Sequence, residues 1–198
     1  METLLQWDTE LFYAINGCRN HVADVVFALL SAPASIAMLL LAIFIWIAWC
    51  PDRRKFIWLP ILLTGACFLF ADRISVLCFK DIFCRLRPCH ALEGVFLVKL
   101  KGFSLIYDHC GGQYGFISSH ATNVFAIATA LGLYFRKYRF LLPLLLLWAG
   151  LVGYSRIYCG VHYFGDVFCG ALVGMLIGLG LACVAVFLRG YLHKKTKP

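Results

Sequence analysis

The stretch from Phe140 to Asp166, FLLPLLLLWAGLVGYSRIYCGVHYFGD, decides the fold class of this chain. It opens with an apolar run, Phe140 to Tyr158, whose length approaches the roughly 20 helical residues that cross a hydrocarbon core of about 30 Å. Ionisable residues then follow at the end of the run, with Arg156 inside its last turn and His162 and Asp166 just beyond. One segment therefore combines a predicted membrane span with candidate site residues.

Further apolar runs have the same character, and short charged or glycine-rich breaks separate them. With 62% hydrophobic residues, 14% charged residues and a mean hydropathy of +0.83, the 198-residue chain is far more apolar than a soluble domain. We therefore predict an all-α, polytopic membrane helical bundle of five to six helices, with residues 1–198 in a single domain. The five predicted spans are Val22 to Trp49, Phe56 to Phe79, Phe116 to Phe135, Phe140 to Tyr158 and Tyr163 to Leu188.

The net charge of +8 falls mainly at the ends of these spans, which argues against a nucleic-acid partner. Basic clusters at 53–55 and 136–139 follow the first and third spans, and a basic tail, 189–198, follows the fifth. The positive-inside rule places these clusters in the cytoplasm. Residues 80–115 and 155–163 then lie on the outer side, although the first of these segments carries cations of its own.

The N-terminal residues 1–20 mix apolar side chains with Asp8 and Glu10. This pattern predicts an interfacial N-terminal helix or, alternatively, a short extra core helix. Near the other end of the chain, the spacing of Gly170, Gly174 and Gly178 predicts a face for close helix packing, with a dimer contact as the weaker alternative.

The ten cysteines form no pattern that is typical of a zinc site, and several lie within apolar spans as expected for packing residues. Cys89 and Cys110 bracket the predicted outer loop, where oxidation is possible. A bridge between them and two free thiols are equally compatible with the sequence. We expect no metal and no cofactor.

Polar side chains gather at the predicted outer ends of the spans, where ionisable groups are costly and are functional candidates. They suit phosphoryl transfer, in which positioning and charge neutralisation at the phosphate oxygens dominate. Arginine can bind phosphate through two parallel hydrogen bonds, and serines at a helix N-terminus add to an anion site. The candidate phosphate-binding residues are Lys80, Arg87, Ser118, Ser119 and Arg156.

His162 and Asp166 are four residues apart, so a helix would place them on one face. Asp166 could then orient His162, which we predict to be the nucleophile that forms a phosphohistidine. His120 is predicted to protonate the leaving oxygen and then to activate water. Simpler readings exist for each element: the cations could extend to lipid headgroups, the His162–Asp166 pair could be structural, and Ser118-Ser119 could be an N-cap.

The spacing of these residues resembles the motifs of the type 2 phosphatidic acid phosphatase (PAP2) superfamily. Residues 80–88, KDIFCRLRP, match the pattern KxxxxxxRP, and residues 155–166, SRIYCGVHYFGD, match SRxxxxxHxxxD. The motif PSGH is present as residues 117–120, ISSH, with Ile and Ser in place of Pro and Gly. The resemblance implies a PAP2-type bundle in which His162 is the nucleophile, His120 is the general acid and the Lys and Arg residues bind phosphate without a metal.

The leading hypothesis is a metal-independent lipid phosphate phosphatase of the bacterial inner (cytoplasmic) membrane, with its site at the periplasmic face. Candidate substrates are undecaprenyl diphosphate, phosphatidylglycerophosphate, phosphatidate and lipid A phosphate. The compact size favours undecaprenyl diphosphate, with lipid A phosphate close behind. One alternative is a phospholipid or lipid A phosphotransferase, which needs the same residues. Another is a non-hydrolytic anionic-lipid transporter, which needs a phosphate clamp but no nucleophile.

Overall fold

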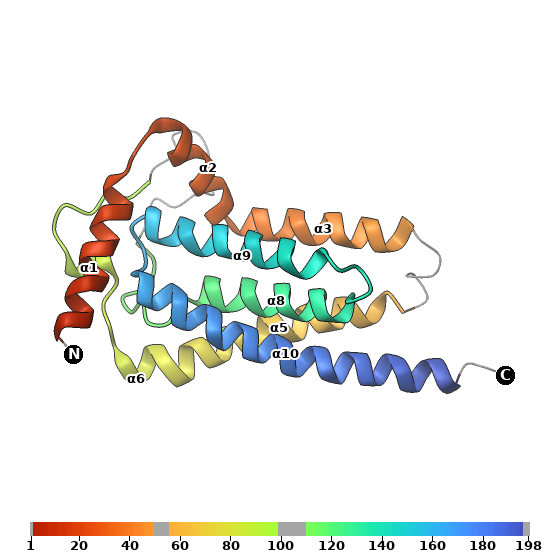
Figure 1. Ribbon diagram of the computed structural model, residues 1–198. Coiled ribbons are helices and arrows are strands. Elements are labelled where there is room, and N and C mark those ends of the chain that lie inside the picture. Colours follow the sequence, from red (N-terminus) through yellow and green to blue (C-terminus); the bar gives the residue numbers. More distant parts are fainter. Residues whose placement is uncertain (1, 50–55, 99–109, 196–198) are drawn as a thin grey trace.

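The computed structural model describes residues 2–49, 56–98 and 110–195, and Figure 1 shows them as a helical bundle. Within these residues the chain is almost entirely helical and contains no strand beyond one isolated bridge, which confirms the predicted all-α fold. In chain order the elements are α1 (Glu2–Gly17), α2 (His21–Ser31), α3 (Pro33–Trp49), α5 (Trp58–Ser75), the π-helix η1 (Val76–Lys80), α6 (Asp81–Phe83), α7 (Pro88–Ala91), α8 (Ser119–Tyr134), α9 (Leu141–Tyr158) and α10 (Phe164–Lys195).

Among the described residues, three helical segments are long and apolar enough to cross a membrane, namely Trp58–Phe83, Leu141–Tyr158 and Phe164–Lys194. A fourth is obtained if α2 and α3, which meet at a bend of 65°, count as one span. The first predicted span is therefore not a continuous helix. Pro33 explains the break, because proline disfavours the helical conformation in the preceding residue and Ala32 is extended.

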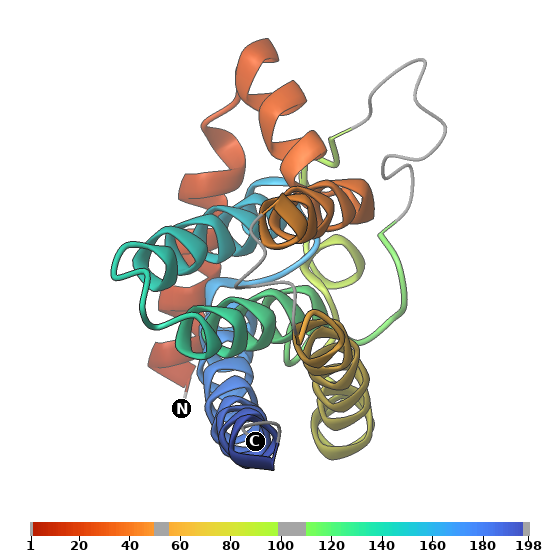
Figure 2. The same cartoon turned by 90° about the vertical axis from the view of Figure 1, so that its right-hand side faces the viewer.

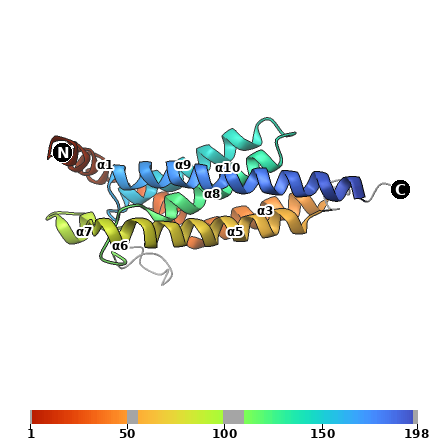
Figure 3. The same ribbon diagram turned by 90° about the horizontal axis from the view of Figure 1, so that it is seen from below.

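The helix in the remaining predicted span, 116–135, is shorter than predicted. Its helix, α8, begins at Ser119 and has 16 residues, of which 12 are buried. The helices α5, α9 and α10 pack around α8, which makes it the central helix of the bundle. Figure 2 shows this arrangement nearly end-on, and Figure 3 shows α5 and α10 running side by side.

Three glycines of α10 allow it to approach α8 closely. A Cβ atom at any of them would collide with a backbone carbonyl of the α8 segment, so the predicted packing role of this face is confirmed within one chain. The contact places the start of α8 beside the start of α10. The glycines are Gly170, Gly174 and Gly178, and the carbonyls are those of Ser118, Thr122 and Ala126.

Figure 1 shows α1 crossing the end of the bundle at which α10 begins. Its inner face buries Phe12 and Asn16, and the Asn16 amide donates to the carbonyl of Tyr158 at 2.8 Å. Its outer face leaves Leu4 and Trp7 68% and 64% exposed. The helix therefore closes the end of the bundle with one face and presents apolar side chains on the other.

The opposite end of the bundle carries basic residues. Arg136, Lys137 and Arg139 lie exposed between α8 and α9, and Arg189 of α10 donates to the carbonyl of Tyr134 at 3.5 Å. The predicted basic cluster at 53–55 lies outside the described residues, as do residues 99–109 of the predicted outer loop.

Candidate active site

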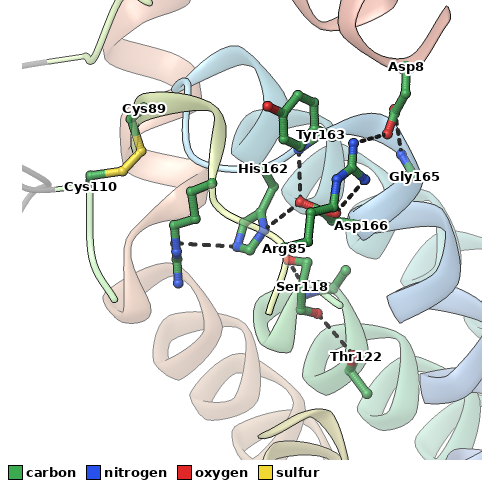
Figure 4. A network of polar contacts seen from close by, with 12 residues as sticks. Asp8, Arg85, Cys89, Cys110, Ser118, Thr122, His162, Tyr163, Gly165 and Asp166 are labelled. Carbon is green, nitrogen blue, oxygen red and sulfur yellow. Dashed lines mark hydrogen bonds and ion pairs between the residues drawn. A yellow bond between two sulfur atoms is a disulfide. The ribbon is translucent and has the colours of Figure 1, made fainter. Parts of the chain in front are cut away.

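Figure 4 shows three of the predicted site residues, Ser118, His162 and Asp166, close together at the end of the bundle where α8 and α10 begin. Arg87 caps the short helix α7, Ser118 caps α8, and Arg156 lies in the last turn of α9. Lys80 ends the π-helix η1, a local irregularity that is frequent at functional sites. Four separate segments of the chain thus contribute to one place.

His162 and Asp166 form a buried pair at the centre of this place. Nδ1 of His162 lies 3.4 Å from Oδ2 of Asp166, and both side chains are almost completely buried. The pair does not share a helical face as predicted, because α10 begins only at Phe164. Instead, Asp166 lies in the first turn of α10 and accepts the backbone N–H of Tyr163 at 3.1 Å, so the carboxylate holds the start of the helix and the imidazole together.

The other ring nitrogen of His162 faces a cation. Nε2 lies 3.5 Å from Nη1 of Arg87, a contact that assigns the Nδ1–H tautomer to a neutral imidazole, since guanidinium can only donate. Burial and the positive charges of Arg87, Arg156 and Lys80 lower the pKa of His162 well below its usual range. An unprotonated Nε2 beside a cation is available to attack a phosphate bound at that cation.

Arg87 is held by the segment that follows the outer loop. Its N–H donates to the carbonyl of Gln113 at 3.1 Å, and a Cβ atom at Gly111 would lie 3.3 Å from Nη1 of Arg87. A disulfide between Cys89 and Cys110 joins the same two segments, so the structure answers the question that the sequence left open. Residues 110–115 therefore lie against Arg87.

Arg156 and Lys80 complete the group of cations. Arg156 is 2% exposed, and its Nη1 donates to the hydroxyl of Ser31, at the bend between α2 and α3. Lys80 interacts electrostatically with both arginines, and His120 interacts with all three cations and with His162. The end of the bundle therefore concentrates positive charge around the neutral imidazole, as an anionic substrate requires.

The two serines of the second motif have structural partners. Oγ of Ser118 accepts the N–H of Ala121 at 3.4 Å, as an N-cap does, and its own N–H donates to the carbonyl of Asp166 at 3.0 Å. Oγ of Ser119 lies 2.7 Å from Oγ of Ser75. The groups that remain to donate hydrogen bonds to an anion are the backbone N–H groups in the first turn of α8.

Two residues without a predicted role, Arg85 and Asp8, lie at the start of α10. Arg85 donates to Oδ1 of Asp166 at 3.0 Å and to Asp8 of α1 at 2.8 Å. Arg85 occupies a variable position inside the first motif, and Asp8 is remote in sequence, so no spacing pattern identifies either.

Among the described residues, one group of side chains could hold a metal ion by the spacing of its ligand atoms. It consists of Cys89, His90 and Cys110. The two sulfur atoms of this group are joined in the disulfide and are not available as thiolate ligands.

Comparison with known proteins agrees with the motifs. Residues 69–189 match the family model of the PAP2 superfamily. A lipid A 4′-phosphatase of Porphyromonas gingivalis is 32% identical over 96% of this chain and 77% of its own length.

Two solved structures share the fold. The crystal structure of Aquifex aeolicus LpxE is 28% identical, with a TM-score of 0.59, over 87% of this chain and 93% of its own. A transmembrane PAP2-type phosphatidylglycerolphosphate phosphatase of Bacillus subtilis is 21% identical, with a TM-score of 0.60, over 100% of this chain and 89% of its own. The family match and the identity over nearly the full length decide the classification: this chain belongs to the PAP2 superfamily and is a membrane-embedded lipid phosphate phosphatase.

Proposed function

We propose that this protein hydrolyses a phosphomonoester of lipid A through a phosphohistidine at His162. The observation that carries the mechanism is the position of His162, with Nδ1 3.4 Å from Asp166 and Nε2 3.5 Å from Arg87. One ring nitrogen is thus oriented by a carboxylate, and the other faces a side chain that can hold phosphate.

In the first step, Arg87, Arg156 and Lys80 neutralise the phosphate oxygens. Nε2 of His162 attacks the phosphorus in line, and the bond between phosphorus and the lipid oxygen breaks. His120 gives a proton to that oxygen, so the dephosphorylated lipid leaves as an alcohol.

In the second step, His120 takes a proton from a water molecule, whose oxygen attacks the phosphohistidine. The phosphorus–nitrogen bond breaks, and inorganic phosphate and neutral His162 are released. Asp166 stabilises the positive charge of the imidazole while phosphorus is bound to it.

The substrate class is supported by the curated relative. The Porphyromonas gingivalis relative, which is 32% identical, is named lipid A 4′-phosphatase, and the alignment covers 96% of this chain. The comparisons give no corresponding support for undecaprenyl diphosphate, which size alone favoured. We therefore place lipid A phosphate first among the candidate substrates.

The outer, periplasmic face of the inner membrane is the proposed location of the site. The site and the exposed basic residues between α8 and α9 lie at opposite ends of the bundle, which supports this orientation by the positive-inside rule. The disulfide beside Arg87 also supports an oxidising compartment.

The activity is tested by phosphate release from lipid A, undecaprenyl diphosphate, phosphatidylglycerophosphate and phosphatidate, using purified protein in detergent with EDTA. We expect the fastest release from lipid A. His162→Ala should lose at least about 10³-fold in kcat, and His90→Ala, an exposed histidine, should not. Release by His162→Ala at the wild-type rate would contradict the nucleophile. Transfer of phosphate to another lipid instead of water would identify the phosphotransferase alternative.

The orientation is tested with a membrane-impermeant maleimide on spheroplasts. Two variants each retain one reactive thiol, either the exposed Cys18 near the site or a cysteine introduced by Lys137→Cys at the opposite end. We expect Cys18 to react in intact spheroplasts and the Lys137→Cys thiol to react only after permeabilisation. The reverse pattern would overturn the proposed orientation.

A further inference from the structure

The N-terminal helix α1 contacts the catalytic pair through Asp8 and Arg85, two charged side chains that no motif specifies. We propose that Arg85 and Asp8 are positioning residues, which hold the Asp166 carboxylate in the orientation that His162 needs and thereby make α1 part of the catalytic machinery. This inference rests on the proposed role of His162 as nucleophile.

Arg85 bridges two carboxylates. Its Nη1 donates to Oδ1 of Asp166 at 3.0 Å and its Nη2 donates to Oδ2 of Asp8 at 2.8 Å, as Figure 4 shows. The guanidinium lies 4.0 Å from the centre of the Tyr163 ring, a distance at which a cation is attracted to an aromatic face. These contacts fix the guanidinium on three sides.

Asp8 also reaches the start of α10 directly. Its Oδ1 accepts the backbone N–H of Gly165 at 2.9 Å, so a carboxylate from α1 satisfies one of the free N–H groups in the first turn of α10. The residue at 165 must be small, because a Cβ atom there would lie 2.9 Å from Oδ2 of Asp8. Asp8 therefore holds both Arg85 and the backbone next to Asp166.

The two oxygens of Asp166 have different partners. Oδ1 accepts from Arg85, while Oδ2 faces Nδ1 of His162 and accepts from the backbone of Tyr163. Asp166 is 0% exposed, and a buried carboxylate needs a charged partner to stay ionised. Arg85 supplies that charge and prevents the carboxylate from turning Oδ2 away from His162.

Arg85 differs in its partners from the predicted phosphate-binding cations Lys80, Arg87 and Arg156. Each of its terminal nitrogens donates to a carboxylate, which places the guanidinium against Asp166 and Asp8. Its loss should slow the chemical step and leave substrate binding nearly unchanged, whereas loss of a phosphate ligand should raise KM.

The test compares Arg85→Gln, Asp8→Asn and Gly165→Ala with wild type in the phosphate-release assay. We expect Arg85→Gln to lower kcat by about 10- to 100-fold, the effect of losing a hydrogen bond to a charged group, and to leave KM within about threefold. Asp8→Asn and Gly165→Ala should lower kcat by smaller factors. The double variant Arg85→Gln/Asp8→Asn should lose less than the product of the two single losses, because both act through the same contact. Asp8→Glu should recover part of the activity lost in Asp8→Asn.

The control pair is Arg19 and Asp24, which form a salt bridge of 2.9 Å in which the arginine is as exposed as Arg85, and for which no contact to His162 or Asp166 is found among the described residues. Arg19→Gln and Asp24→Asn should keep wild-type kcat. If Arg85→Gln and Asp8→Asn keep the wild-type kcat, or change only KM, the positioning role is overturned. In that case an inactive His162→Ala would still uphold the proposed function. An active His162→Ala would instead overturn the proposed function itself. If Arg85→Gln does not fold, Gly165→Ala and Asp8→Asn decide the question, because they leave Arg85 and Asp166 in place.

Discussion

Oγ of Ser119 lies 2.7 Å from Oγ of Ser75, so the first residue of α8 is hydrogen-bonded to the last residue of α5. The Ser75 hydroxyl donates to the carbonyl of Asp72 at 2.8 Å, which leaves Ser119 as the donor of the pair. Ser119 stands where the PAP2 motif has glycine, and this contact gives its hydroxyl a partner in the neighbouring helix. Ser119 is the first residue of α8, so its backbone N–H is one of the groups that have no acceptor within the helix, as it would be for glycine.

We expect Ser119→Ala to keep kcat and KM within about twofold of wild type, because alanine retains the backbone N–H that suits an anion. The variant should lose about 1 kcal/mol of stability through the missing hydrogen bond. Ser75→Ala is the matched control, and the double variant should cost little more than either single change. A tenfold increase in KM for Ser119→Ala alone would show that the hydroxyl itself binds phosphate.

The protonation of His162 gives a pH-dependent stability that can be measured without substrate. Its pKa in the folded protein lies well below about 6.5, the value expected in the unfolded chain, because of burial and the nearby cations. The unfolded state therefore binds more protons between the two values, and stability rises with pH there. The contribution is complete above about pH 6.5 and is lost as the pH falls through the lowered folded-state value.

Thermal unfolding of wild type and His162→Gln between pH 5 and 8 checks this prediction. Wild type should lose up to about 1.4 kcal/mol per pH unit below pH 6.5 from this one group, and His162→Gln should show a correspondingly flatter dependence. His90→Gln, which changes an exposed histidine, should keep the wild-type slope. Equal slopes for wild type and His162→Gln would mean that His162 is not held neutral in the folded protein.

Ser31 should influence phosphate binding through Arg156. The Ser31 hydroxyl accepts from the guanidinium of Arg156 and is 1% exposed, so its removal leaves a buried charged group without that partner. We expect Ser31→Ala to raise KM about tenfold, as a hydrogen bond to a charged group is worth about 1.5–3 kcal/mol. Ser35→Ala is the control at the same bend, since its hydroxyl donates to the carbonyls of Leu30 and Ala32. An unchanged KM in Ser31→Ala would show that Arg156 holds its position without Ser31.

Sequence patterns predicted the helical class and placed the candidate polar residues at one end of the spans, because span length and motif spacing are local properties. His162 and Asp166 were expected together for this reason, and they are, although a helix start rather than a helical face joins them. Pro33 by itself predicts a helix break after Ala32. The apolar run continues across this position, however, and for that reason the segment was predicted as one span.

Contacts between distant segments were not predictable in the same way. Arg85 and Asp8 are 77 residues apart, and their ion pair depends on how α1 crosses the end of the bundle. The hydrogen bond from Arg156 to Ser31 similarly depends on the bend between α2 and α3. Such partners follow from packing, which a single sequence with helical periodicity does not specify.

The close contact between α8 and α10 supplies the last prediction, because it sets the second motif beside the third. Gly174 faces the carbonyl of Thr122 with no room for a Cβ atom, whereas a Cβ atom at Gly180 would meet nothing within 4 Å. Gly174→Ala should therefore destabilise the protein by about 1–3 kcal/mol through overpacking and lower kcat by moving Asp166 relative to α8. Gly180→Ala should raise stability by up to about 1 kcal/mol, because alanine is the better helix former, and leave kcat unchanged. Thermal unfolding and phosphate release measured on the same preparations distinguish the two effects. If Gly174→Ala matched Gly180→Ala in both measurements, the α8–α10 contact would not control the geometry of the site.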